Sequence, residues 1–116
     1  LPPAACAASL AALEIIETDP ELLRNLRMNS RFLRELLGNR DVQSQVSTPI
    51  LPIIIGDAGK TMEISRKLFD RGLFVSGIRP PTVPAGESRL RITVSAQHSK
   101  EEIECLVSSL RELIPA

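Results

Sequence analysis

Apolar and polar positions change their spacing several times along the chain, and each change marks a separate predicted element. Residues 4–16 are apolar almost all round a helix, and a helix of that kind needs burial on several faces. Pro20 and Glu21 then open a second helix, which should run to about Leu37 and end at Gly38. Its leucines recur at helical spacing, and its other side, expected to be solvated, carries Arg24, Arg27, Arg31 and Arg34.

The middle of the chain predicts a strand, a helix and a second short strand. Pro49 and Pro52 flank the start of the first strand, which runs through Ile55. Because proline lacks an N–H group, they favour an edge or a strand-entry position. A helix to about Arg71 follows, and residues 73–78 supply the second strand. The helix has Gly72 as its cap and a narrow apolar face made of Ile64, Leu68 and Phe69.

The junction between that strand and helix is similar to a nucleotide-binding phosphate loop, since Gly56 and Gly59 precede Lys60 and Thr61. Such a loop needs four residues between its glycines, so that successive backbone N–H groups surround the phosphates. Only two intervene here. The place of the missing glycine is taken by Ile54, which suits a buried strand. We therefore expect a strand, a turn and a helix start, with no nucleotide role.

The last third of the chain combines a proline-rich loop with a strictly alternating strand. Residues 79–86 contain three prolines and a glycine, which preclude a helix and predict an extended, stiff loop. In the strand that follows, Leu90, Ile92 and Val94 face one side, and Arg89, Arg91 and Thr93 face the other.

Ser99 and Glu102 match a capping box for a final helix. Its apolar positions are Ile103, Leu106, Val107, Leu110 and Ile114. The predicted fold class is α+β, a small sheet of about three strands with helices on one face and a stripe of arginines on the uncovered face. We expect a helical segment over residues 1–40, which links to a further domain, and a small α/β domain over residues 41–116.

Composition excludes several kinds of partner. Lysine plus arginine and aspartate plus glutamate balance at 14 each, so no net field attracts nucleic acid or an anionic membrane. The apolar start is shorter than the roughly 20 residues that span a bilayer. Cys6 and Cys105 lack metal or redox spacing and are expected to be buried free thiols. Because the chain starts abruptly at Leu1 with a helix that needs burial, we expect a piece of something larger.

Few residues could carry chemistry. His98 is the only histidine, and no serine or cysteine beside it comes with a fixed acidic partner, so neither a nucleophilic triad nor a zinc site is predicted. Arg89 and Arg91 are different, because a guanidinium on a strand is rigidly based and can bind a carboxylate through two hydrogen bonds. The pattern alone leaves two alternatives open, an anion clamp and ordinary exposed strand residues.

Residues 72–106, with the sequence GLFVSGIRPPTVPAGESRLRITVSAQHSKEEIECL, resemble the C-terminal signature of the α-oxoamine synthases. The most specific part is RPPTVPAG followed by SRLRIT, and LPPAACAASLAALEII and LPIIIGD fit the same family in the same order. The resemblance implies the C-terminal small domain of a fold-type I pyridoxal-phosphate enzyme. These enzymes condense an amino acid with an acyl thioester and release carbon dioxide, with the cofactor as electron sink.

The resemblance also implies site residues and partners. Arg91 would bind the substrate carboxylate and Thr82 would line the substrate site, whereas Arg89 has no inherited role. The family's cofactor-binding lysine belongs to a large domain, and Lys60, Lys67 and Lys100 do not lie in its sequence context, so no catalytic or cofactor-binding residue is expected here. The implied partners are that large domain and a second subunit in a cytoplasmic homodimer. If the protein ended at these residues, the alternative would be a small non-enzymatic binding or interaction module.

Overall fold

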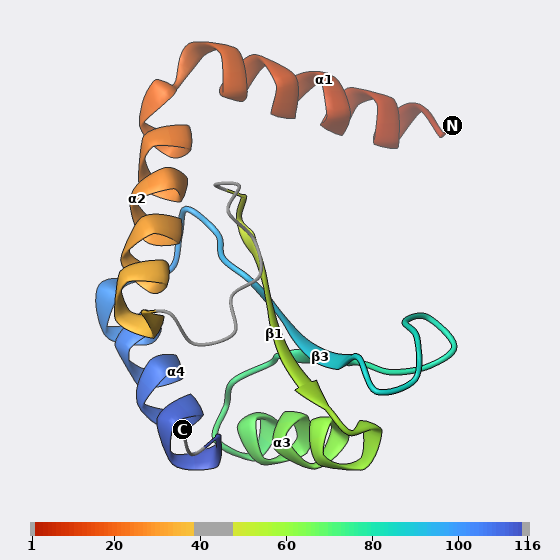
Figure 1. The fold of residues 1–116 in the computed structure, drawn as a ribbon. Coiled ribbons are helices and arrows are strands. Elements are labelled where there is room, and N and C mark those ends of the chain that lie inside the picture. The colour runs from red at the N-terminus through yellow and green to blue at the C-terminus, as the bar shows by residue number, and fades with distance from the viewer. Residues whose placement is uncertain (1, 39–47, 115–116) are drawn as a thin grey trace.

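The computed structural model describes residues 2–38 and 48–114 and confirms the predicted order of elements. Two helices come first, followed by a strand, a helix, two strands and a final helix (Figure 1). The bounds of these elements are α1 Pro3–Thr18, α2 Pro20–Leu37, β1 Ile50–Gly56, α3 Ala58–Asp70, β2 Ser76–Ile78, β3 Ser88–Thr93 and α4 Lys100–Leu113.

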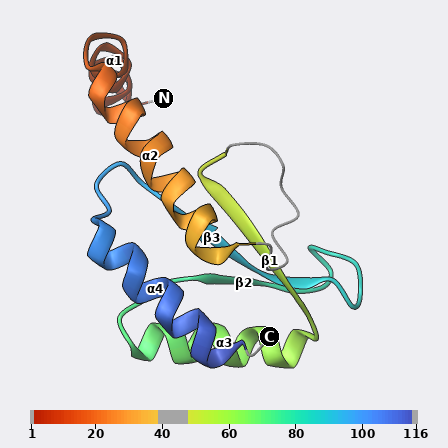
Figure 2. The same ribbon diagram turned by 60° about the vertical axis from the view of Figure 1, so that its left-hand side comes forward.

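The three strands form one antiparallel sheet in the order β1-β3-β2, so β3 is central and β1 is an edge strand. The edge position is one of the two alternatives that Pro49 and Pro52 predicted. Figure 2 shows α3 and α4 together on one side of the strands, and the second half of α2 lies beside α4. The sheet therefore has one covered and one open face, as the sequence predicted.

The core lies between the covered face and the three helices. The central strand contributes Leu90 and Ile92, which with Val94 are buried as the alternation predicted. The second helix contributes Leu33 and Leu37, so its C-terminal half shares this core. The remaining buried apolar residues are Leu51, Ile53, Leu68, Val75, Ile103, Val107 and Leu110.

Local signals place the helix ends. Asp19 accepts a hydrogen bond from the backbone N–H of Glu21 at the start of α2, and the capping box of Ser99 and Glu102 is present at the start of α4. After α3, Gly72 adopts φ 82°, where a side chain would be strained. Its N–H donates to Phe69 and that of Leu73 donates to Leu68, a Schellman arrangement that ends the helix.

The first helix differs from all the others in having no buried residue. It runs away from the sheet and packs against α2 (Figure 1). Its exposed apolar side chains are Leu10, Leu13, Ile15 and Ile16. Within the described residues, no helix is long and apolar enough to cross a membrane.

Several expectations about individual side chains were wrong. Phe69 was expected on the apolar face of α3 but is 63% exposed, because the core contact is made one residue earlier by Leu68; its ring packs edge-on against the exposed Phe74. Cys6 and Cys105 were expected to be buried but are exposed, because α1 buries no residue and Cys105 is not among the residues that α4 buries. Arg34 is half-buried and donates to the Thr48 carbonyl at 2.9 Å, although it was expected on a solvated face.

Two segments also differ from the prediction. Residues 73–75 do not extend the second strand, which is limited to β2, and only Val75 among them is buried. The proline-rich loop is not extended, because two turns fold it: Thr82 N–H donates to Arg79 and Glu87 N–H donates to Pro84. The peptide bond between Pro80 and Pro81 is cis. The division at residue 40 stays a prediction, and residues 39–47 lie outside the described part of the chain.

Candidate functional site

The open face of the sheet carries the predicted clamp. Arg91 on β3 pairs directly with Pro52 on one side and with Ser76 on the other. Directly paired residues of antiparallel strands project from the same face, so these three form one cross-sheet row. Both flanking side chains are short, which leaves the long guanidinium of Arg91 to rise above its neighbours.

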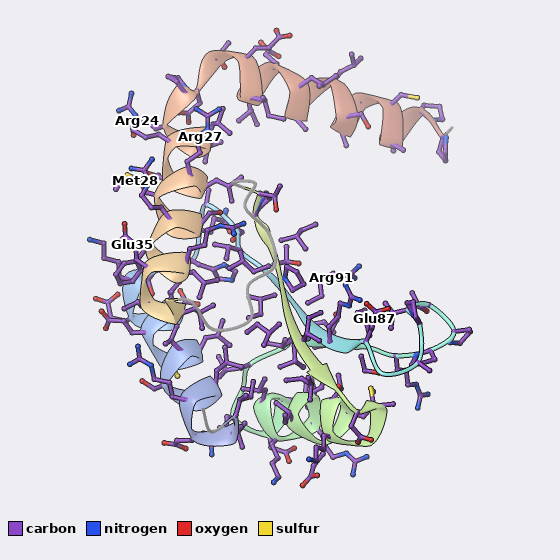
Figure 3. The ribbon with its side chains drawn as sticks, in the orientation of Figure 1. Arg24, Arg27, Met28, Glu35, Glu87 and Arg91 are labelled. Carbon is purple, nitrogen blue, oxygen red and sulfur yellow. The ribbon has the colours of Figure 1, made fainter. Side chains whose placement is uncertain are left out.

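The side chain of Arg91 is exposed to solvent. In residues 2–38 and 48–114 no side chain forms a hydrogen bond or ion pair with its guanidinium. Figure 3 shows it projecting from β3 on the side of the loop that carries Glu87. A planar donor group on a rigid central strand, with its N–H groups uncommitted, is suited to gripping a carboxylate with two hydrogen bonds.

Arg89 lies on the same face but is already engaged. Its Nε donates to the backbone carbonyl of Glu87 at 3.1 Å, and the side chain is half-buried between Ile54 and Ile78, its cross-strand partners. The two arginines that the sequence pattern could not separate therefore differ in their surroundings. Arg89 fastens the loop to the strand, whereas Arg91 is available.

Thr82 lies elsewhere, in a groove of about 600 Å³ at the end of β2. The groove is lined by Ala58, Gly77, Ile78, Arg79, Pro80, Pro81 and Thr82. Arg91 does not line it, so the described residues do not bring Thr82 and Arg91 together in one pocket. The substrate role of Thr82 stays a prediction.

The groove has a charged group that sequence reasoning missed. Arg79 is exposed at its wall and, among the described residues, is the only charged residue that lines it. The signal in the sequence was an arginine directly after a short apolar strand, but the position of that strand beside α3 was needed to place it. Gly77 lets α3 approach, because a Cβ there would come within 3.0 Å of the Met62 sulfur.

The lysines of the chain do not fit the anchoring of pyridoxal phosphate. Lys60 and Lys67 belong to α3 and Lys100 to α4, the helices that pack against the covered face. Lys67 pairs with Glu63 at 3.0 Å, and Lys100 lies over the ring of Phe32 at 5.7 Å. No lysine projects from the strands that carry Arg91. The expectation that this chain contributes no cofactor-binding residue stays a prediction.

His98 and its neighbours do not form a nucleophilic site in the part of the chain that the structure describes. Ser95 Oγ lies 3.4 Å from His98 Nδ1, but that nitrogen accepts the backbone N–H of Ser95 at 2.9 Å. The carboxylate of Glu102 caps the start of α4, where it accepts a hydrogen bond from the backbone N–H of Ser99. This bond, and to a smaller extent the Ser99 hydroxyl, lowers the pKa of Glu102 below its usual range. Within residues 2–38 and 48–114, no cluster of three potential metal ligands occurs.

Comparison with known proteins gives a consistent family. A family model described as aminotransferase class I and II matches residues 1–110. The 8-amino-7-oxononanoate synthase of Pseudomonas entomophila is 45% identical over 117 residues, which cover 98% of this chain and 30% of that protein. That of Lysinibacillus sphaericus is 40% identical over 114 residues, covering 97% of this chain and 29% of that protein. The chain thus spans about a third of the length of these curated relatives.

Solved structures agree with these relatives. A serine palmitoyltransferase from S. paucimobilis, solved with pyridoxal phosphate and myriocin bound, superposes with a TM-score of 0.86 at 25% identity and covers 97% of this chain and 29% of that one. The 8-amino-7-oxononanoate synthase of Francisella tularensis superposes with a TM-score of 0.80 at 25% identity, covering 97% of this chain and 33% of that one. The fold of the described residues is therefore that of one part of a pyridoxal-phosphate enzyme.

Proposed function

Because the chain belongs to the class I and II aminotransferase family, we propose that it forms the small domain of a pyridoxal-phosphate-dependent C-acyltransferase. The parent enzyme would condense an amino acid with an acyl thioester and release carbon dioxide. The names of the relatives at 40% and 45% identity support 8-amino-7-oxononanoate synthesis. From the family likeness we propose L-alanine and a pimeloyl thioester as its substrates, in biotin synthesis.

The contribution of this chain would be to bind and orient the amino acid. The observation that carries this role is the exposed, uncommitted guanidinium of Arg91 on the central strand, flanked by Pro52 and Ser76. Two parallel hydrogen bonds to a carboxylate would fix both the position and the plane of the substrate. Thr82 would border the same substrate from the proline-rich loop.

The cofactor would be supplied and anchored by the part of the enzyme outside this chain. When bound there it would provide the electron sink for the loss of carbon dioxide. No lysine of this chain lies on the face that carries Arg91, so this domain would hold the substrate and exclude water, while the anchoring group comes from the large domain. We also propose that the parent enzyme is a cytoplasmic homodimer, as the family likeness implies.

The proposed reaction can be tested on the full-length enzyme that contains this chain. We expect release of carbon dioxide from carboxyl-labelled L-alanine only when a pimeloyl thioester is present. Glycine and serine serve as competing amino acids, and palmitoyl and acetyl thioesters as competing acyl donors. If another pair reacts at least tenfold faster, the substrates are wrong but the reaction class stands. If no pair reacts, the proposed function is wrong and a binding or interaction module becomes the better explanation.

A further inference from the structure

The turn after the arginine strand is held to α2 by contacts that the proposed function leaves unexplained. Residues 95–98 connect β3 to α4, and Asn29 of α2 reaches them across the domain. Its Nδ2 donates to the carbonyl of Ser95 at 3.0 Å and to that of His98 at 2.9 Å. An amide group that faces two carbonyls must present its NH₂ group, so its orientation is fixed.

His98 closes the same turn from within. Its Nδ1 accepts the backbone N–H of Ser95 at 2.9 Å, so Nδ1 carries no proton in this arrangement and the ring N–H lies on Nε2. The backbone N–H of His98 also lies 3.3 Å from the Ser95 carbonyl that Asn29 binds. Both ends of the turn are thus tied to each other and to α2.

The position of this turn matters because β3 loses a neighbour after Arg91. The short strand β2 ends its pairing at Ser76 opposite Arg91, and the strand beyond that point pairs only with β1. The last of those bonds runs from Val94 N–H to the Pro49 carbonyl at 2.9 Å. The Asn29 contacts are therefore the second support of the strand end that follows the clamp.

We propose that Asn29 and His98 are positioning residues, which set the place of Arg91 relative to α2 by holding the end of its strand. Neither touches the proposed substrate. We call the hydrogen bonds of Asn29 and His98 with the turn at residues 95–98 the joint. Because α2 follows α1 in the chain, the joint would link Arg91 to the part of the protein that precedes this domain. The kinetic consequence rests on the proposed function, whereas the hydrogen-bonded joint itself does not.

Substitutions that keep the size of the side chain can distinguish a positioning role of Asn29 and His98 from a general contribution to packing. Asn29→Asp keeps the shape but turns a carboxylate toward two carbonyls, whereas Asn25→Asp makes the same change at an exposed position one turn earlier in α2. His98→Ala removes the acceptor, and His98→Asn restores one, because Asn Oδ1 can occupy the place of Nδ1. The charged groups near His98 are Glu102 and Lys100 of α4, and all variants leave them intact.

The test uses the full-length enzyme with two readouts. We expect Asn29→Asp and His98→Ala to raise the KM for the amino acid about threefold to tenfold, with kcat within about twofold and the acyl-thioester KM unchanged. Asn25→Asp and His98→Asn should stay within about twofold of the wild type. Hydrogen exchange at the Ser95 and Val94 amides should become at least about tenfold faster in the first two variants only.

The two readouts have separate meanings. Unchanged exchange at both amides in Asn29→Asp would overturn the joint, whether or not the enzyme is active. A fall in kcat with a similar rise in both KM values would indicate general structural damage and would also overturn the joint. The same holds if the KM for the amino acid is as high in His98→Asn as in His98→Ala. If the wild type itself has no acyltransferase activity, the proposed function fails, and the exchange data alone decide whether the joint exists.

Discussion

Replacement of Leu90 by alanine should destabilise the domain far more than any change on the opposite face of the same strand. Leu90 lies in the centre of β3, is 0% exposed, and pairs with Ile53 and Gly77 on the covered face. Alanine would remove most of a fully buried side chain and leave a cavity between the sheet and the helices. Measured costs for such changes are about 2 to 5 kcal/mol.

We expect the upper half of that range. Gly77 beside Leu90 has no side chain to fill the space, and the edge strand β1 is held in register by its pairing with β3. A loss of about 3 to 4 kcal/mol is a large part of the roughly 5 to 15 kcal/mol that stabilises an ordinary domain. It would lower the melting temperature by about 10 to 20 °C.

Urea unfolding of the chain, followed by circular dichroism, measures this cost, and Arg91→Ala is the matched control one residue away on the open face. The control should change the free energy of unfolding by less than about 0.5 kcal/mol, because an exposed residue without partners contributes little. A loss below about 1 kcal/mol for Leu90→Ala would refute the assignment of the covered face. So would a loss for Arg91→Ala as large as that for Leu90→Ala.

Three further predictions concern parts of the chain outside the sheet. The amides of α1 should exchange faster than those of α2 and α4 in a monomeric sample, because no residue of α1 is buried; the strongest protection at residues 7–16 would contradict this. Borohydride reduction of the isolated chain with pyridoxal phosphate should give no single labelled lysine, as checked by peptide mass spectrometry; stoichiometric labelling of one lysine with turnover would show a complete enzyme. The depressed pKa of Glu102 should stabilise the domain above about pH 4.5, its usual value, and this contribution should disappear as pH falls through the lowered value. The stability difference between wild type and Glu102→Gln in acid titrations should therefore shrink as the pH falls through the lowered pKa, and a difference that stays constant would contradict the lowering of that pKa.

Elements with a strong local signal could be predicted from the sequence. The alternation around Leu90 fixed which side of β3 is buried, and the capping box at Ser99 placed the start of α4 within one residue. Pro49 and Pro52 indicated an edge or strand-entry position, because a proline has no N–H group to donate to a neighbouring strand. Each of these features is determined by residues that lie within a few positions of it in the sequence.

Features that depend on distant neighbours could not be predicted. Phe69 and Leu68 are both apolar and adjacent, and only the approach of the sheet decides which one is buried. Arg34 is half-buried and donates to the carbonyl of Thr48, and the bonds of Asn29 join parts of the chain that are far apart in sequence. Arg89 and Arg91 likewise share a pattern, but Arg89 is half-buried and bonded to a loop carbonyl, whereas Arg91 is exposed.

The central claim is that Arg91 binds the carboxylate of the amino-acid substrate, and steady-state kinetics of Arg91→Ala, Arg91→Lys and Arg89→Ala in the full-length enzyme test it most directly. Removing one partner of a desolvated charge pair costs about 2 to 5 kcal/mol, so Arg91→Ala should lower kcat/KM by at least about 30-fold and raise the amino-acid KM. Lysine keeps the charge but loses the two-bond geometry, so it should restore only part of the activity. Cofactor absorbance should be unchanged in all three variants. A wild-type kcat/KM in Arg91→Ala would contradict the claim, and an equal loss in Arg89→Ala would mean that positive charge on the open face, and not the free guanidinium of Arg91, binds the substrate.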